Sequence, residues 1–231
     1  MNNIKHFTAV ACLGLACVGN ASAVVPTTLS DLNSWSVLGD VLATSSTARL
    51  TTASLTFEDD FPAGAGVFNI SGTSAADNYS GSLESFAGLT NGALGSDAFE
   101  GSALKQTFNV NAGDTLSFGW KFLTNEGTQP DYAFVVINGV ASTLVTTAAA
   151  ASPSTPLTWE TGNGVFSHSF ASASVVTLAI GVVDIGDYNV TSELRISDVA
   201  LAPIPEPESY ALMLAGLGLL GALTRRRARK S

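Results

Sequence analysis

The chain has 231 residues, of which 46% are hydrophobic and only 13% charged, and its formal net charge is −9. This acidic balance excludes a basic nucleic-acid-binding domain, because such a domain needs positive surface to displace counterions from the phosphate backbone. The high apolar content excludes a disordered chain, and the scarcity of Lys and Glu excludes a coiled coil.

The N-terminus has the three parts of a secretory signal peptide. Lys5 gives a short cationic start, an apolar run follows from Phe7 to Val18, and Ala21 and Ala23 are the small residues of a cleavage site. The sequence therefore predicts a signal peptide over residues 1–23, cut after Ala23 by signal peptidase, and an exported protein. Both cysteines lie in this segment, so the mature chain is expected to have neither disulfides nor thiol chemistry.

Residues 24–204 contain no convincing amphipathic helix. They do contain short runs of β-branched and aromatic residues, separated by Gly, Asn, Asp, Ser and Pro, and such runs predict strands. The turn residues Asn111–Asp114 predict a hairpin between two of them, and Asn138-Gly139 predicts another turn. In chain order the predicted strands are 35–42, 49–57, 104–110, 115–123, 132–137, 165–170, 175–183 and 194–201.

Several short strands without helical crossovers predict one all-β domain over residues 24–204, an antiparallel jelly-roll-like β-sandwich. The stretch 62–101 is rich in Gly, Ser and Ala, and it predicts long loops with a short strand or two. The expected core is formed by Trp35, Phe108, Phe118, Trp120, Phe122, Phe134, Val136, Phe170, Leu178 and Ile180.

The body offers little for catalysis. Its single histidine, His168, lies between two serines in a strand pattern, and no G-x-S-x-G nucleophile elbow occurs. Zinc is disfavoured because the body has one histidine and no cysteine. We therefore predict no catalytic residues and a protein that is not an enzyme. A glycan-active hydrolase is the alternative, since paired acids beside a cleft can hydrolyse glycosides.

Carboxylates are plentiful in the body, and two hypotheses are open for them. Oxygen-rich loops suit a structural calcium ion, which takes about 6–8 oxygen ligands, although no spacing here matches an EF-hand loop. A solvated acidic surface is the favoured alternative. No other cofactor is expected. The acids to test first for calcium are Asp40, Glu58, Asp59, Asp60 and Asp198.

Sugar binding is commonly based on exposed aromatic faces with polar groups at their edges. Trp159 follows a loop rich in Pro, Ser and Thr and is the best single candidate for contact with a ligand, with an interior position as the alternative. The body has four basic residues (Arg49, Lys105, Lys121 and Arg195) against 17 acids, a formal charge of −13. It is therefore far more acidic than the whole chain.

The C-terminal segment 205–231 has three parts. The triplet Pro205, Glu206, Pro207 is followed by an uncharged run over residues 209–224, which as a helix is ~24 Å long against the ~30 Å of a hydrocarbon core. A basic cluster that can snorkel and prefers the cytoplasmic side closes the chain, so we predict a single transmembrane helix over 209–224. The basic tail, 225–231, contains Arg225, Arg226, Arg227, Arg229 and Lys230.

This order of motif, short helix and Arg-rich end resembles the PEP-CTERM sorting signal of exosortase substrates in Gram-negative bacteria. The resemblance implies an exosortase, a membrane cysteine protease, as partner. That protease would cut near Pro205–Pro207 and release or transfer the body. It also implies transient anchoring in the inner membrane, then delivery to the cell surface or the extracellular space.

The body resembles the β-sandwich of carbohydrate-binding modules. The resemblance is carried by the W-x-V-x-G-D segment from Trp35 to Asp40, the N-A-G-D-T segment from Asn111 to Thr115, and Asp198 in the last strand. Together the two resemblances imply a non-enzymatic surface or extracellular-matrix protein, as in a biofilm, associated with exopolysaccharide. A passive surface coat without a specific ligand is a further alternative, and no nucleic-acid partner is expected.

Overall fold

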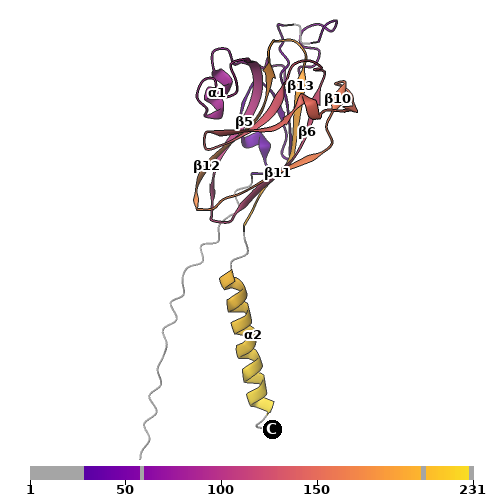
Figure 1. Ribbon diagram of the computed structural model, residues 1–231. Helices are drawn as coiled ribbons and strands as arrows, with labels where there is room; N and C mark the ends of the chain where they lie inside the picture. Colours follow the sequence, from indigo (N-terminus) through magenta and orange to yellow (C-terminus); the bar gives the residue numbers. More distant parts are fainter. Residues whose placement is uncertain (1–28, 58–59, 204–206, 229–231) are drawn as a thin grey trace, which may run out of the picture.

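Two antiparallel sheets pack face to face in the computed structural model, which describes residues 29–57, 60–203 and 207–228 (Figure 1). The predicted all-β antiparallel sandwich is therefore confirmed. Sheet A has the order β1 (Ser36–Leu38), β5 (Ala98–Val110), β12 (Ser174–Ile185), β7 (Tyr132–Ile137) and β8 (Val140–Thr146), and β4 (Ala76–Asp77) also pairs with β5. Sheet B has the order β2 (Asp40–Ala43), β3 (Thr47–Thr51), β13 (Ser192–Ala202), β6 (Thr115–Thr124), β10 (Trp159–Glu160) and β9 (Ser152–Pro153), and β11 (Gly164–Ser169) also pairs with β6.

The main core lies between the two sheets. Strand residues alternate between the faces of a sheet, so Leu178 and Ile180 of β12 meet Leu194 and Ile196 of β13 in one buried cluster. Trp120 differs from the other predicted core residues because it is only partly buried.

A second cluster covers the outer face of sheet A. The short helix α1 (Ser82–Ala87) buries Leu83 there beside Phe134 and Val136, two residues predicted for the core between the sheets. Figure 1 shows α1 on the outside of β5. This helix lies in the stretch predicted as long loops with a short strand or two. β4 and the irregular segments around it match that prediction, whereas α1 was not predicted. Among the described residues α1 packs against strands of sheet A. On the outer face of sheet B, the loops 67–70 and 156–157 lie beside buried Glu193, and the face is open around Arg195.

The predicted strand 35–42 is split at Gly39 between the two sheets. Gly39 has φ of +85°, and a Cβ atom there would lie 2.7 Å from the carbonyl oxygen of Gly101, so the position favours glycine. The chain passes at this residue from β1 in sheet A to β2 in sheet B.

The hairpin predicted across Asn111–Asp114 is wrong. β5 pairs with strands of sheet A and β6 with strands of sheet B, so this turn links the two layers. The physical reason is burial: Phe108 and Phe118 both enter the core between the sheets. The turn predicted at Asn138-Gly139 does close a hairpin between β7 and β8, with positive φ at both residues.

The C-terminal helix α2 (Pro207–Ala228) includes the predicted helical run 209–224. The transmembrane assignment needs correction, because none of the described helices is both long enough and apolar enough to cross a membrane. The uncharged run is ~24 Å long as a helix, and arginines follow it directly. Some sequence predictions concern residues outside the described ranges: the signal peptide 1–23 with Ala21 and Ala23, and Glu58, Asp59, Pro205, Glu206, Arg229 and Lys230.

Candidate functional site

A groove of about 710 Å³ lies on the open outer face of sheet B. β3, β13 and β6 form its base, and residues near the start of β11 form one side. Leu194 and Ile196 of β13 enter the core, so alternation directs Arg195 and Ser197 outward, into the groove. The lining residues are Thr47, Ala48, Arg49, Gly119, Trp120, Lys121, Pro156, Asn163, Gly164, Val165, Arg195, Ile196, Ser197 and Asp198.

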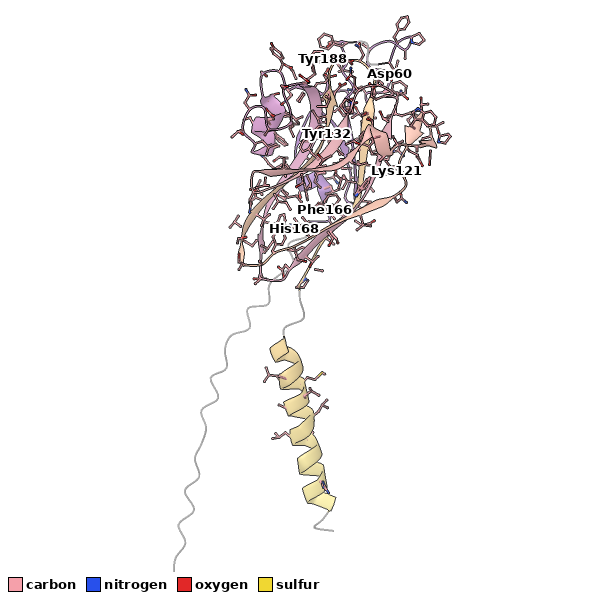
Figure 2. All side chains as sticks on the ribbon, viewed as in Figure 1. Asp60, Lys121, Tyr132, Phe166, His168 and Tyr188 are labelled. Carbon is pink, nitrogen blue, oxygen red and sulfur yellow. The ribbon has the colours of Figure 1, made fainter. Side chains whose placement is uncertain are left out.

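Three cations form a row across the base of the groove. Arg195 of β13 is directly opposite Arg49 of β3 on one side and directly opposite Lys121 of β6 on the other. Figure 2 shows Lys121 on the side of the body formed by sheet B. The row contains three of the four basic residues of the body.

A buried carboxylate holds the two arginines. Glu193, which is 1% exposed, accepts a hydrogen bond from Arg49 Nε at 2.5 Å. It also accepts bonds from Arg195 Nε at 2.8 Å and from Arg195 Nη2 at 3.2 Å. Burial alone would raise the pKa of Glu193, but the hydrogen bonds from both guanidinium groups outweigh it and lower the pKa. The same bond raises the pKa of Arg49.

Lys121 is held at the other end of the row. Its ammonium donates to Glu160 Oε1 at 3.0 Å, and Ser154 donates to Glu160 Oε2 at 2.7 Å. The bond from Ser154 and then that from Lys121 lower the pKa of Glu160. All three cations are thus oriented by an acid, and each remains partly exposed to the groove.

Small residues lie beside this row. Gly119 lies opposite Ser197, and a Cβ atom at Gly119 would come within 2.7 Å of Ser197 Oγ. Gly164 lies opposite Trp120, and a Cβ atom there would be 2.2 Å from the indole ring. Trp120 packs against the interior cluster, so its ring extends beneath Gly164 on the inner face. The groove thus combines polar groups with apolar side chains such as Pro156 and Val165.

Asp40, the first acid proposed for calcium, is fully buried and already well bonded. It accepts hydrogen bonds from the Thr51 hydroxyl, from Ile70 N at 3.0 Å and from Ser71 N at 2.8 Å. These bonds fasten the loop before β4 to strand β2. Asp40 therefore has a structural role that needs no metal ion.

The other proposed calcium ligands are not brought together with Asp40. Asp60 accepts from Asn125 Nδ2 at 2.6 Å and from Thr191 N at 3.2 Å, whereas Asp198 is exposed at the rim of the groove. Among the described residues no three His, Cys, Asp or Glu side chains are grouped so that they could hold a metal ion. Glu58 and Asp59 lie outside those residues, so a calcium site beside Asp60 stays a prediction.

Trp159 lies outside the groove. It is on the two-residue strand β10, where it pairs with Thr124 of β6, and its side chain is 39% exposed. His168 is exposed on β11, and its ring lies edge-on to Phe170 at 4.9 Å between centroids. Figure 2 shows His168 at the opposite end of the body from Asp60 and Tyr188. Neither Trp159 nor His168 is part of the groove.

One end of the interior holds buried acids. Asp184 lies opposite Glu100 in the ladder between β12 and β5, and Asp131 accepts from Ile185 N at 3.0 Å and from Ser192 Oγ at 2.7 Å. Burial raises the pKa of Asp131 to about 7. Burial, and then the charge of Asp131, raise the pKa of Asp184 to about 11. Ionisation of these buried acids therefore destabilises the fold, so their effect on stability depends on pH.

The sequence gives the number of basic residues in the body but does not show that three of them lie together. Arg49, Lys121 and Arg195 are far apart in the chain, and only the strand register places them in one row. The available signal was alternation, since each follows or precedes an apolar core residue in its strand. Alternation shows that they point outward but not which strands are neighbours.

The sorting signal recognised in the sequence is confirmed by a family comparison. Residues 203–228 match the PEP-CTERM protein-sorting motif. This motif implies a protein that is exported, processed by an exosortase, and held at the membrane only transiently before release. No curated protein matches the chain.

Two solved structures of carbohydrate-binding modules are among the structural neighbours. TmCBM61, in complex with beta-1,4-galactotriose, has a TM-score of 0.27 and 13% identity, covering 46% of this chain and 64% of its own. A structure described as "CBM4 structure and function" has a TM-score of 0.31 and 13% identity, covering 73% of this chain and 94% of its own. Both belong to the class that the body resembles in sequence.

Proposed function

We propose that the protein is a non-enzymatic component of the cell surface or extracellular matrix, sorted through residues 203–228, whose body binds polysaccharide in the groove on sheet B. The groove carries this proposal. Its volume of about 710 Å³ lies within the ~300–1,000 Å³ typical of ligand sites, and it lies on the one sheet face that no described helix covers. Its open course across three strands suits a polymer.

The chemistry of the lining supports a hydroxyl-rich ligand. The floor is made of small side chains, including Thr47, Gly119 and Ser197, so a sugar chain can approach the backbone closely. Arg49, Arg195 and other polar groups supply hydrogen-bond donors along the base. A polymer of linked sugars offers hydroxyl acceptors to several of these donors at once.

The proposal of a binding protein rather than a hydrolase is supported by the acids of the groove. Glycoside hydrolysis uses two carboxyl groups about 5–9.5 Å apart. Asp198 is the one carboxylate among the described residues that line the groove. A hydrolase at this position would need a partner for Asp198 that the described lining does not supply.

The binding experiment is a glycan array probed with the full chain and two matched variants. Ser197→Tyr places a large side chain on the groove floor, and Thr107→Tyr places the same side chain at an exposed position of β5 in sheet A. We expect the native chain and Thr107→Tyr to retain the same glycans, and Ser197→Tyr to lose at least tenfold in affinity. Absence of any retained glycan at millimolar concentration would contradict the proposal, as would full binding by Ser197→Tyr.

The sorting step has a separate test. The chain is expressed in its native host with and without a working exosortase, and the fraction that keeps an intact C-terminus is measured by mass spectrometry. We expect the intact form to accumulate in the host without the enzyme. We expect the same in the host with the enzyme when Pro205–Pro207 is replaced by alanines. Equal amounts of the intact form in all three cases would mean that no exosortase processes this protein.

A further inference from the structure

The groove on sheet B concentrates positive charge in a very acidic body. The body has 17 acids and four basic residues, yet Arg49, Lys121 and Arg195 all line this groove. The fourth basic residue, Lys105, is on β5 in sheet A, where it donates to the carbonyl of Phe86. Three of the four basic residues of the body therefore lie on one surface, the groove on sheet B.

The cross-strand pairing of these three cations does not stabilise the sheet. Like charges directly opposite each other on neighbouring strands are destabilising, and Arg195 faces a cation on both sides. Glu193 lies beside Arg49 and Arg195 on the same face and offsets this repulsion in part, since one carboxylate serves two guanidinium groups. Arg49, Arg195 and Glu193 together therefore carry a net charge of +1.

The free donors of the arginines point away from Glu193. Arg49 contacts Glu193 only through Nε, and within the described ranges its Nη1 and Nη2 make no hydrogen bond. Arg195 uses Nε and Nη2 and keeps Nη1. Both side chains are 36% exposed. A guanidinium fixed at one edge presents its remaining N–H groups as a fork that fits a carboxylate.

Glu193 is the acid nearest to the arginines, and its one negative charge is shared by two guanidinium groups. Asp198 is the exposed acid of the lining, three positions beyond Arg195 along β13. At ~3.3 Å per strand residue it is at most ~10 Å away, a distance close to the Debye length at physiological salt. The field of more distant acids on the body is screened over the same length. An anionic group over the arginines therefore meets a net positive charge.

We infer that the groove recognises polysaccharides that carry carboxylate groups, such as uronic acid polymers, through Arg49 and Arg195, with Lys121 as a third contact. This inference rests on the proposed function and adds the ligand class to it. A uronate residue brings its carboxylate to the arginine fork and its hydroxyl groups to the other polar groups of the groove. A neutral glycan offers the guanidinium groups only uncharged acceptors, which form weaker hydrogen bonds with them.

The experiment compares two polymers that differ only in charge. Polygalacturonate and its fully methyl-esterified form share one backbone, and esterification removes the carboxylate charge. Binding of the full chain to each is measured by isothermal titration with EDTA present, so that calcium cannot cross-link the acidic polymer. We expect at least tenfold tighter binding to polygalacturonate than to the ester.

Variants assign the preference to the groove. Arg49→Gln should reduce the affinity for polygalacturonate far more than the affinity for the ester, so that the preference between them is lost. Glu193 keeps Arg195 as its partner in this variant. Arg49→Lys should not restore the preference, because an ammonium lacks the planar fork. Lys105→Gln removes the same charge from sheet A and should change neither affinity. If Arg49→Gln fails to fold, Lys121→Gln takes its place, with a smaller expected loss.

Equal affinity for the two polymers would overturn the inference while leaving the proposed function intact. An unchanged preference in Arg49→Gln would also overturn it, because the charge selectivity would then arise elsewhere. Failure to bind these polymers, together with failure to retain any glycan on the array, would overturn the inference and the proposed function together.

Discussion

Asp184 lies directly opposite Glu100 across the ladder between β12 and β5, and both carboxyl groups are buried. Raised pKa values, about 11 for Asp184 and about 7 for Asp131, mean that the folded chain holds protons that the unfolded chain releases. The contribution of these two acids to stability is therefore fully present below pH ~4, the unfolded pKa. It is lost as pH rises through about 7 for Asp131 and toward about 11 for Asp184.

Replacing Asp184 tests this relationship. Asp184→Asn has the shape of the protonated acid without its ionisation, so it should be more stable than the native chain at pH 7 by about 2–4 kcal/mol. The gain should shrink toward zero near pH 4. Urea denaturation in EDTA at several pH values measures it. Asp97→Asn, at an exposed position, is the control, and a pH-independent difference for Asp184→Asn would rule out this account.

Glu193→Gln should destabilise the sandwich. It leaves Arg49 and Arg195 opposite each other without their shared negative charge. Breaking a fully buried ion pair costs about 3–5 kcal/mol, and here we expect about 2 kcal/mol because the arginines are partly solvated. The lowered pKa of Glu193 means that this contribution is present above its unfolded pKa, ~4.3, and is lost as pH falls through the folded value.

The control for that variant is Glu160→Gln, which removes the acid that pairs with Lys121. Chemical denaturation near pH 7 compares the two. The Glu160 side chain is 24% exposed against 2% for Glu193, and Glu160 pairs with one cation instead of two, so its replacement should shift the midpoint much less. Equal loss in both variants would show that burial does not distinguish the two ion pairs.

Asp40→Asn should loosen the loop before β4. The amide replaces one acceptor oxygen and removes the charge that strengthens the bonds from Ile70 N and Ser71 N. Each bond to a charged group contributes about 1.5–3 kcal/mol, so we expect a loss of about 2 kcal/mol. Hydrogen exchange should accelerate at the amides of Ile70 and Ser71 before those of β7. Unchanged protection at both amides would refute the anchoring role of Asp40.

Gly181→Ala should destabilise the centre of sheet A. A Cβ atom at this position would lie 2.4 Å from Phe134 Cζ and 2.8 Å from the carbonyl oxygen of Ser102. Overpacking of this kind costs about 1–3 kcal/mol. Gly127→Ala is the matched control, because nothing lies within 4 Å of its Cβ position. Thermal melting should separate the two variants by several degrees, and equal melting points would show that sheet A accommodates the methyl group.

The strands with strong alternation could be predicted well from sequence. The predicted strand 132–137 has the bounds of β7, and 115–123 differs from β6 by one residue. The signal is physical, since a strand with a face in the core must alternate or remain apolar. The two-residue strands β9 and β10 carry no such period and could not be predicted. The helix α1 is six residues long, too short to show a helical period.

Which strands pair with one another could not be predicted, and the site depends on this pairing. Asn111–Asp114 has the composition of a hairpin turn, yet it joins two sheets, because the apolar residues on both sides of it meet in the core. The groove could not be predicted for the same reason, because Arg49 and Arg195 are neighbours only through the β3–β13 register. Residue type alone favours Trp159 as a ligand contact, whereas the groove lies elsewhere and is not lined by Trp159.

Strand β13 contains Arg195 and Ser197, and it is also the strand that leads to the sorting segment. It is flanked on both sides, by β3 through residues 193–197 and by β6 through residues 192–202. A pull on the C-terminus acts along this strand, so its backbone hydrogen bonds to both neighbours resist together in shear instead of opening one by one. A polymer bound in the groove and an attachment at the C-terminal tail would both apply force to β13. This strand would then transmit force between the two.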